Sequence, residues 1–462
     1  MNGRPRAFDG VIPPPLHLKM HTPLRNRPGN AAVKPRGFFA RTLWLALAAW
    51  SAQLPAHASS LPECEPRTGL PNFFAKLEAG GPVRIAYLGG SITEAKGWRD
   101  LSRDWFAREY PHAEVRQIRA TISGTGAEFG ACRLHDHVLR HSPDLVFVEF
   151  AVNGAGATDK RAIESVEGII RHVRRNDPKA EVCLVFTVSS GMLKDLRDGR
   201  SPRVVTNMKK VADHYGIPTI DFGPGVARLV DEGKLVVSGP APAKNAPPSG
   251  PMVFSADGTH PIFETGHQLY LDAIVRSIPV IKAAGQPGPH PLPEPLEPEN
   301  WEHGSMVAID APGVIRSPGW SKVEPPDGTE KRQRISEYFP GVWQAGQPGD
   351  SLEFTFEGVG FGLSGFRGPS AGLFRVTVDD RPSIDATFFD SYSHAGRVSH
   401  KAWFYPQGLP HGKHRVRIEF LAAPPDYAAI LKKEGKSIKP PETAPETVFQ
   451  LAAILLAGSL SP

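Results

Sequence analysis

Cysteine is scarce in this chain of 462 residues. Only Cys64, Cys132 and Cys183 are present, so at most one disulfide can form and one thiol is left over. No two cysteines stand in a C-x-x-C pair, which argues against both a disulfide-stapled scaffold and a structural zinc finger. Cys132 and Cys183 fall in a predicted helix and a predicted strand, where we expect small buried hydrophobic residues.

Most of the chain also lacks an excess of charge of either sign. The formal net charge is +5, but eight of the 53 Lys and Arg residues, against one of the 48 Asp and Glu residues, lie within the first 60 positions. The remainder is slightly acidic, without the basic surface that DNA and RNA binding require. We therefore predict no nucleic-acid partner.

No apolar run is long enough to span a bilayer. The most apolar stretch, residues 42–50, follows basic residues and precedes Ala-His-Ala at residues 56–58, which is the pattern of a secretory signal peptide. We expect residues 1–58 to be a signal peptide and leader, and the mature protein to be periplasmic or extracellular, without a stable membrane span. A disordered N-terminal arm and an uncleaved anchor are the alternatives.

Short apolar segments alternate with amphipathic helical segments between residues 70 and 283. This alternation predicts an α/β domain with a parallel sheet covered by helices on both faces. In such sheets the ligand binds at the carboxyl ends of the strands. The expected strands are residues 83–89, 115–122, 144–150, 181–188 and 218–220.

The pattern changes after a proline-rich segment, residues 284–300, which cannot form a helix and is expected to be a linker. From residue 301 to residue 460, apolar and polar residues alternate, which predicts an antiparallel β-sandwich. Residues 424–447, rich in Pro, Lys and Glu, are expected to be an exposed insertion before a last strand at 448–456. The other clear strands are residues 351–357, 373–379 and 414–420.

Two glycine-rich turns follow the first two predicted strands. Gly89-Gly90-Ser91 permits a sharp reversal that would present the Ser91 hydroxyl and amide at the mouth of the sheet, beside the start of a helix. Gly124 follows the second strand, and its amide could approach an oxyanion because no side chain obstructs it. Taken singly, each turn is better explained as an ordinary connection that follows a strand.

Two further polar elements complete an ordered set. Asn153 follows the third strand and is either a turn former or a side-chain amide donor directed into the same crevice. Asp257 and His260 lie three residues apart in a loop, so Asp257 can hold Nδ1 of the imidazole while Nε2 acts as a general base. In isolation, a surface Asp–His pair explains this spacing equally well. Four such elements, in order and after strands, make coincidence a poor account.

Ser91, Gly124, Asn153 and His260 match the four blocks that define the SGNH, or GDSL-like, hydrolase superfamily. The resemblance covers roughly residues 82–282 and implies a flavodoxin-like three-layer α/β/α fold. It also implies a serine nucleophile that forms an acyl-enzyme. The implied triad is Ser91, Asp257 and His260, and the implied oxyanion hole is formed by Ser91, Gly124 and Asn153.

The chain departs from the usual superfamily pattern at two places. Gly90-Ser91-Ile92 replaces Asp-Ser-Leu, and Gly154 stands where an aspartate often follows the asparagine. The resulting Gly-Gly-Ser-Ile-Thr sequence resembles variants among bacterial carbohydrate-active esterases. This resemblance implies removal of acetyl groups from a glycan, or cleavage of another small acyl ester, without cofactor or metal. A glycan O-acetyltransferase and a glycan-binding protein with a relict triad are the alternatives.

Other polar and aromatic residues favour structural explanations. His135, His137 and His141 are close in sequence, but the first two point to different faces of a helix, so solvated side chains are expected rather than metal ligands. Trp98 lies in an apolar helical stripe, which favours packing in the core over stacking on a sugar.

Three aromatic residues of the C-terminal half, Trp343, Tyr392 and Trp403, look exposed in the sequence. Aromatic rings can stack on sugar rings, although in a β-sandwich they more often belong to the core. The C-terminal half is therefore expected either to assist binding of a polymer or only to buttress the first domain.

Overall fold

The computed structural model describes residues 61–241, 250–326, 336–339, 341–393, 398–436 and 446–461. These residues belong to one compact unit that begins at His57. The expected signal peptide, residues 1–58, lies outside the described residues. No helix within the described ranges is long and apolar enough to cross a bilayer.

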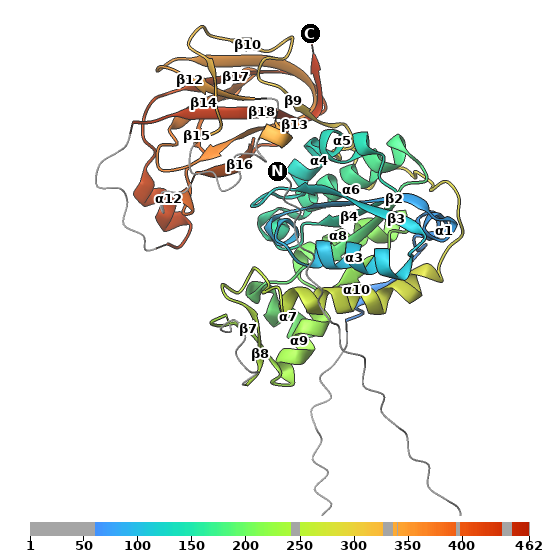
Figure 1. Ribbon diagram of the computed structural model, residues 1–462. Helices are drawn as coiled ribbons and strands as arrows, with labels where there is room; N and C mark the ends of the chain where they lie inside the picture. Colours follow the sequence, from blue (N-terminus) through green and yellow to red (C-terminus); the bar gives the residue numbers. More distant parts are fainter. Residues whose placement is uncertain are drawn as a thin grey trace, which may run out of the picture. The chain divides into compact units, whose positions relative to one another are not determined.

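The first half of the chain contains the predicted parallel sheet (Figure 1). Its order is β1-β6-β5-β4-β2-β3, and only the short edge strand β1 is antiparallel. The five parallel strands are therefore arranged 2-1-3-4-5 in chain order, as in flavodoxin-like folds. The strands are β1 (Cys64–Glu65), β2 (Gly81–Gly89), β3 (Ala113–Thr121), β4 (Leu145–Glu149), β5 (Glu181–Phe186) and β6 (Thr219–Asp221).

Helices cover both faces of this sheet, which confirms the predicted α/β fold. Helices α1 (Pro71–Ala79), α3 (Trp98–Glu109) and α10 (Gly266–Lys282) pack together on one face. The other face carries α4 (Ala127–Cys132), α6 (Asp159–Asn176) and α8 (Arg203–Tyr215). Strands β4 and β5 are buried at every position, which explains why they are continuous apolar runs.

Short elements connect these layers. They are α2 (Ser91–Glu94), α5 (Leu134–His137), η1 (Leu139–His141), η2 (Asn153–Gly156), η3 (Ser190–Met192), α7 (Leu193–Arg197) and α9 (Gly223–Asp231), with a parallel pair of strands, β7 (Leu235–Ser238) and β8 (Met252–Ser255). Cys132 and Cys183 are buried, as predicted, and none of the three cysteines forms a disulfide.

The second half is an antiparallel β domain, also as predicted. It comprises β9 (Gly304–Val307), β10 (Ile315–Arg316), β11 (Ser321–Val323), β12 (Val342–Ala345), β13 (Ser351–Arg367), β14 (Leu373–Val378), β15 (Ile384–Thr387), β16 (Ser399–Phe404), β17 (Gly412–Phe420) and β18 (Phe449–Ser461). The strands form one hydrogen-bonded network, because β13 pairs first with β17 and then with β16 on one edge while β18 follows its other edge.

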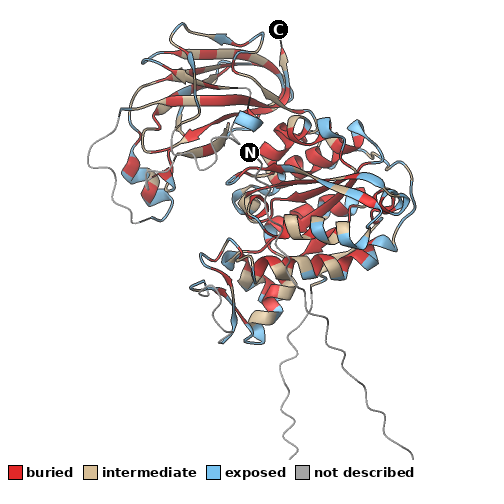
Figure 2. Cartoon of the chain, in the orientation of Figure 1, coloured by how far each residue is buried: buried red, intermediate tan, exposed pale blue. Residues whose placement is uncertain are grey.

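Strand β18 is apolar on both faces. Leu451, Ile454 and Leu456 belong to the core of the β domain, whereas Leu455 and Ala457 belong to the core of the α/β domain. Helix α4 packs against this second face, and Figure 2 shows β18 as largely buried. The strand therefore joins the two hydrophobic cores, which explains why its sequence does not alternate.

The proline-rich segment at residues 284–300 lies against α6. Its backbone accepts hydrogen bonds from Arg171, at Pro293 O (2.6 Å), and from Arg174, at Pro291 O (2.8 Å). The segment is thus docked along the first domain.

The prediction of an exposed insertion at 424–447 is wrong for its first part. That part forms α12 (Tyr427–Lys433), whose Tyr427 and Leu431 are buried in the core of the β domain. Much of the remainder of the segment, residues 437–445, lies outside the described residues.

Candidate active site

The turn after β2 brings Asn153 next to Ser91. Gly90 is buried and extended, and Ser91 is the first residue of α2. A Cβ atom added to Gly90 would lie 2.2 Å from Asn153 Oδ1, closer than any real contact. Position 90 must therefore be glycine for the Asn153 side chain to lie against the turn that carries Ser91.

A buried carboxyl group lies beneath this turn. Glu149, the last residue of β4, accepts hydrogen bonds from Thr93 Oγ1 (2.7 Å) and Thr187 Oγ1 (2.6 Å). Burial raises the pKa of Glu149. The carboxyl group links α2 to the ends of β4 and β5. Its role was not predicted from the sequence, although a glutamate in an otherwise apolar strand was an available signal.

A buried arginine holds the ends of the two strands that precede the site. Arg133 donates hydrogen bonds to Ala120 O (2.8 Å) and Gly89 O (3.3 Å), and its guanidinium lies over the Phe129 ring. Burial lowers the pKa of Arg133 to about 10, so the group stays charged at neutral pH. Arg133 therefore fixes the backbone two residues before Ser91, a role that the sequence analysis also missed.

The loop after β8 forms a closed set of hydrogen bonds around Asp257. Its Oδ1 accepts from the backbone amides of His260 (2.8 Å) and Thr259 (2.9 Å), and its Oδ2 lies 2.7 Å from His260 Nδ1. Gly258 has a φ of +78°, a conformation that favours glycine. Burial acts to raise the pKa of Asp257, but the hydrogen bonds from His260 and Thr259 outweigh it and hold the pKa well below its usual range.

Ser91 and His260 meet although they are far apart in the sequence. Ser91 Oγ lies 2.8 Å from His260 Nε2, so Ser91, His260 and Asp257 form one hydrogen-bonded chain. The His260 and Asp257 side chains are 48% and 56% exposed. The chain of three residues is thus open to solvent, and its geometry allows His260 to take a proton from Ser91.

The loop that carries Gly124 leaves the sheet beside the Ser91 turn, because Ile122 N donates to Gly89 O (3.1 Å). Thr125 Oγ1 closes this loop on Ile122 O (2.6 Å), and Gly124 has a φ of +72°. A glycine is therefore favoured at position 124 by its backbone conformation.

Gly154, the second departure from the superfamily pattern, lies where there is little space for a side chain. A Cβ atom at Gly154, immediately after Asn153, would lie 3.0 Å from Val204 Cγ2. This is tighter than nine in ten real Cβ contacts, so a larger residue at position 154 requires the Val204 side chain to move by a few tenths of an ångström.

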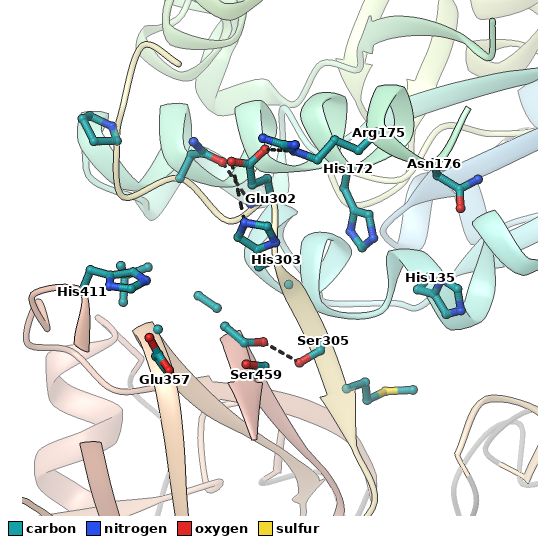
Figure 3. A pocket seen from close by; sticks show the side chains of 18 of the residues that line it. His135, His172, Arg175, Asn176, Glu302, His303, Ser305, Glu357, His411 and Ser459 are labelled. Carbon is teal, nitrogen blue, oxygen red and sulfur yellow. Dashed lines mark hydrogen bonds and ion pairs between the residues drawn. The ribbon is translucent and has the colours of Figure 1, made fainter. Parts of the chain in front are cut away.

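A cavity of about 1060 Å³ lies away from these residues (Figure 3). It is lined by residues of α5 and α6, by the chain that enters the β domain, and by β13, β18 and His411 of that domain. Neither Ser91 nor its partners line it. Burial lowers the pKa of His172 to about 4. This imidazole is therefore neutral at neutral pH. Because its lining residues are different, the cavity is separate from the hydrogen-bonded Ser–His–Asp chain.

Comparison with protein families decides the class of the first domain. Residues 87–264 match the model of the GDSL-like lipase/acylhydrolase family. This first domain is an SGNH, or GDSL-like, hydrolase domain. The protein is accordingly a carboxylic ester hydrolase. A search of curated proteins finds no match.

Solved structures extend the likeness beyond the SGNH domain. A two-domain esterase (CEX) active on acetylated mannans, co-crystallised with mannopentaose, is 19% identical and has a TM-score of 0.62. That match covers 86% of this chain and 96% of the other. A second structure of such an esterase is 20% identical, with a TM-score of 0.63 over 84% and 94% of the two chains. At these identities the likeness establishes the shared fold of both domains.

The other aromatic residues and histidines singled out from the sequence differ in how far they are buried. Trp98 is fully buried, which confirms its place in the core. His135 and His141 are exposed, as expected, but the prediction of a solvated side chain is wrong for His137, which is buried and hydrogen-bonded to Tyr338 O (3.0 Å). Trp343 and Trp403 pack partly buried against the core of the β domain. Of the three aromatic residues, only Tyr392 is strongly exposed, at 69%.

Proposed function

We propose that this esterase removes O-acetyl groups from a carbohydrate, with Ser91, His260 and Asp257 as its triad. The hydrogen-bonded chain of these three residues within an SGNH domain is the observation that carries the proposal. Two facts support a carbohydrate substrate: the Gly-Gly-Ser-Ile-Thr turn, and the fold shared over both domains with an esterase active on acetylated mannans.

In the first half-reaction Ser91 Oγ attacks the acetyl carbon and passes its proton to His260 Nε2. The carboxylate of Asp257 orients the imidazole and stabilises its charged form. The negative oxygen that develops on the acetyl group accepts hydrogen bonds from the amides of Ser91 and Gly124 and from the Asn153 side chain. The sugar oxygen then takes the proton from His260 and leaves, and the acetyl group stays on Ser91 as an ester.

In the second half-reaction water replaces the sugar. His260 takes a proton from the water as its oxygen attacks the acetyl carbon, and Ser91 leaves with that proton. The products are acetate and the free enzyme. The exposure of the His260 and Asp257 side chains supports water as the acceptor, because a transferase must keep water away from its acyl-enzyme.

We also propose that the enzyme is exported, with residues 1–58 as the signal peptide and leader. The apolar stretch before Ala-His-Ala at 56–58 supports this. Expression of the full chain in a Gram-negative host, followed by fractionation and N-terminal sequencing, should find a mature protein beginning near Ser59. A protein that stays in the cytoplasm with its N-terminus intact would contradict export.

The function is tested by incubating the protein from Ser59 onward with acetylated mannan, acetylated xylan, acetylated pectin and p-nitrophenyl acetate. Released acetate is measured enzymatically, and Ser91→Ala serves as the inactive control. We expect acetate from at least one glycan and none from the control. Turnover of the aryl ester without acetate release from any glycan would leave an esterase but reject the carbohydrate substrate.

A further inference from the structure

The last residue of β13 reaches toward the proposed active site. Arg367 Nε donates to Ser399 Oγ (2.7 Å) and Nη1 donates to Asp390 Oδ2 (2.8 Å), and the side chain is 17% exposed. Within the described part of the chain, Nη2 makes no hydrogen bond. The guanidinium is therefore held rigidly on one edge and keeps a free donor on the other.

That free donor faces the loop of the proposed oxyanion hole. A Cβ atom added to Gly124 would lie 3.3 Å from Arg367 Nη2. Gly124 belongs to the SGNH domain and Arg367 to the β domain. The β domain thus places a fixed cation directly against the loop whose amide is proposed to bind the oxyanion.

Tyr392 extends this arrangement to the surface. Arg367 Cζ lies 4.9 Å from the centre of the Tyr392 ring, over its face. The turn that carries the ring is fixed by Asp390, whose Oδ1 accepts from the Tyr392 amide (3.0 Å). Because Tyr392 is 69% exposed, the ring face opposite Arg367 is open to solvent.

A second cation makes the base of this arrangement rigid. Asp390, nearly buried, also lies 3.1 Å from Lys401 Nζ. Burial acts to raise the pKa of Asp390, but Lys401 and Arg367 outweigh it and hold the pKa below its ordinary value. The carboxylate therefore stays ionised and keeps Arg367 in place when Tyr392 is changed.

We propose that Arg367 and Tyr392 form a sugar-binding subsite of the β domain at the edge of the active site. Tyr392 stacks on the pyranose ring next to the acetylated position, and Arg367 Nη2 donates a hydrogen bond to one of its hydroxyl oxygens. An exposed aromatic face beside a fixed donor suits a neutral ligand that has both apolar C–H faces and hydroxyl groups. This inference rests on the proposed function, since the bound sugar is the one that carries the ester.

The test compares two substrates that share the acetyl group and differ in the sugar. Initial rates are measured on chemically acetylated mannopentaose and on p-nitrophenyl acetate. We expect Tyr392→Ala to lower kcat/KM for the pentasaccharide about tenfold and to leave kcat/KM for the aryl ester unchanged. Tyr392→Phe, which keeps the ring, should behave as the wild type on both substrates.

Arg367→Gln should raise KM for the pentasaccharide with little change in kcat, because Arg367 binds the sugar before and during the reaction alike. The matched control is Arg375→Gln, which removes an exposed arginine of the same domain that pairs with Asp385. This control should change neither substrate's kinetics.

Two outcomes would overturn the subsite. One is Tyr392→Ala with the same ratio of kcat/KM for the two substrates as the wild type. The other is Arg367→Gln with an equal loss on both substrates, which would make Arg367 a structural support of the Gly124 loop. Failure of the proposed function looks different: the wild type itself would release no acetate from any glycan, and the subsite would then be rejected with it.

Discussion

The loop after β8 and the junction between the two domains are built in opposite ways. In the loop, Asp257 and His260 lie within a few residues of each other, are half exposed, and are held by hydrogen bonds. At the junction, the rings of His400, Phe129 of α4 and Phe339 pack against one another, with the His400 centroid 5.0 and 5.3 Å from the two phenyl centroids, and all three are buried. The proposed chemistry thus depends on a local polar structure, and stability depends on long-range apolar packing.

The loop and the junction also differ in the ionisation of their side chains. Hydrogen bonds keep Asp257 ionised in the loop despite partial burial, whereas at the junction burial lowers the pKa values of His137 and His400 to about 3. Both histidines are therefore neutral in the folded protein at neutral pH. Substitutions in the loop should change activity at nearly constant stability, and substitutions at the junction should do the reverse.

The largest expected effect is on activity alone. Ser91→Ala removes the proposed nucleophile, and loss of a triad member typically costs about 10⁴- to 10⁶-fold in kcat. The free energy of unfolding should change by less than about 0.5 kcal/mol, because the serine is only partly buried. Steady-state kinetics on p-nitrophenyl acetate and urea unfolding measure the two effects. Retention of a tenth of the wild-type kcat would exclude Ser91 as nucleophile.

The corresponding change at the junction should affect stability alone. Phe339→Ala leaves a cavity between His400 and His137, and such truncations of buried aromatics cost about 3–5 kcal/mol. At a temperature where the variant is folded, its kcat on the aryl ester should equal that of the wild type. An unchanged urea midpoint would show that the junction does not contribute to stability as the packing implies.

A smaller effect is expected from the proposed oxyanion donor. Asn153→Ala should lower kcat by about 10²- to 10³-fold, with a minor change in KM, because the donor acts on the negative charge of the transition state. The control is Asn300→Ala, a variant at a carboxamide hydrogen-bonded to Glu297 O in the segment docked along the first domain. Equal kcat values for Asn153→Ala and the wild type would remove Asn153 from the mechanism.

The smallest effect concerns pH. A histidine whose pKa is lowered on folding binds protons more readily in the unfolded chain. The contribution of His400 to the free energy of unfolding is therefore fully present above the ordinary pKa of about 6.5, and it is lost as the pH drops toward 3. His400→Gln should reduce the slope of unfolding free energy against pH by about 1.4 kcal/mol per pH unit in this range. Urea titrations between pH 4 and 7, roughly the range set by these pKa values, test it.

His411→Gln is the matched control, since His411 lies exposed in the same domain. Its slope should equal that of the wild type. Identical slopes for His400→Gln and the wild type would mean that His400 is protonated in the folded protein, against its burial.

Much of the fold could be predicted because each strand is short and the pattern of its own apolar residues shows which of its faces are buried. The buried parallel strands β4 and β5 read as apolar runs, and the first half of β13 alternates because only one of its faces is covered. The helix α12 could not be predicted, because its few apolar residues stand in a segment whose composition resembles an exposed loop.

The candidate site was predictable to the extent that each of its proposed residues follows a strand and has its own local signal. Glycine beside Ser91 and the three-residue spacing of Asp257 and His260 are such signals. Glu149 and Arg133 were missed because their role lies in what surrounds them. A buried carboxyl or guanidinium group is recognisable only when its hydrogen-bond partners, which come from other strands, are known.

The sequence by itself determined the class of both domains, the order of the polar elements and the Asp257–His260 pair, because these depend on residues that are neighbours along the chain. Only the tertiary structure decided that Ser91 meets His260 across 169 positions and that Arg367 of the β domain lies against Gly124. It also decided that β18 serves two cores at once. Contacts of this kind are set by the packing of whole strands and helices. A local pattern of residues does not predict which distant segment will pack against them.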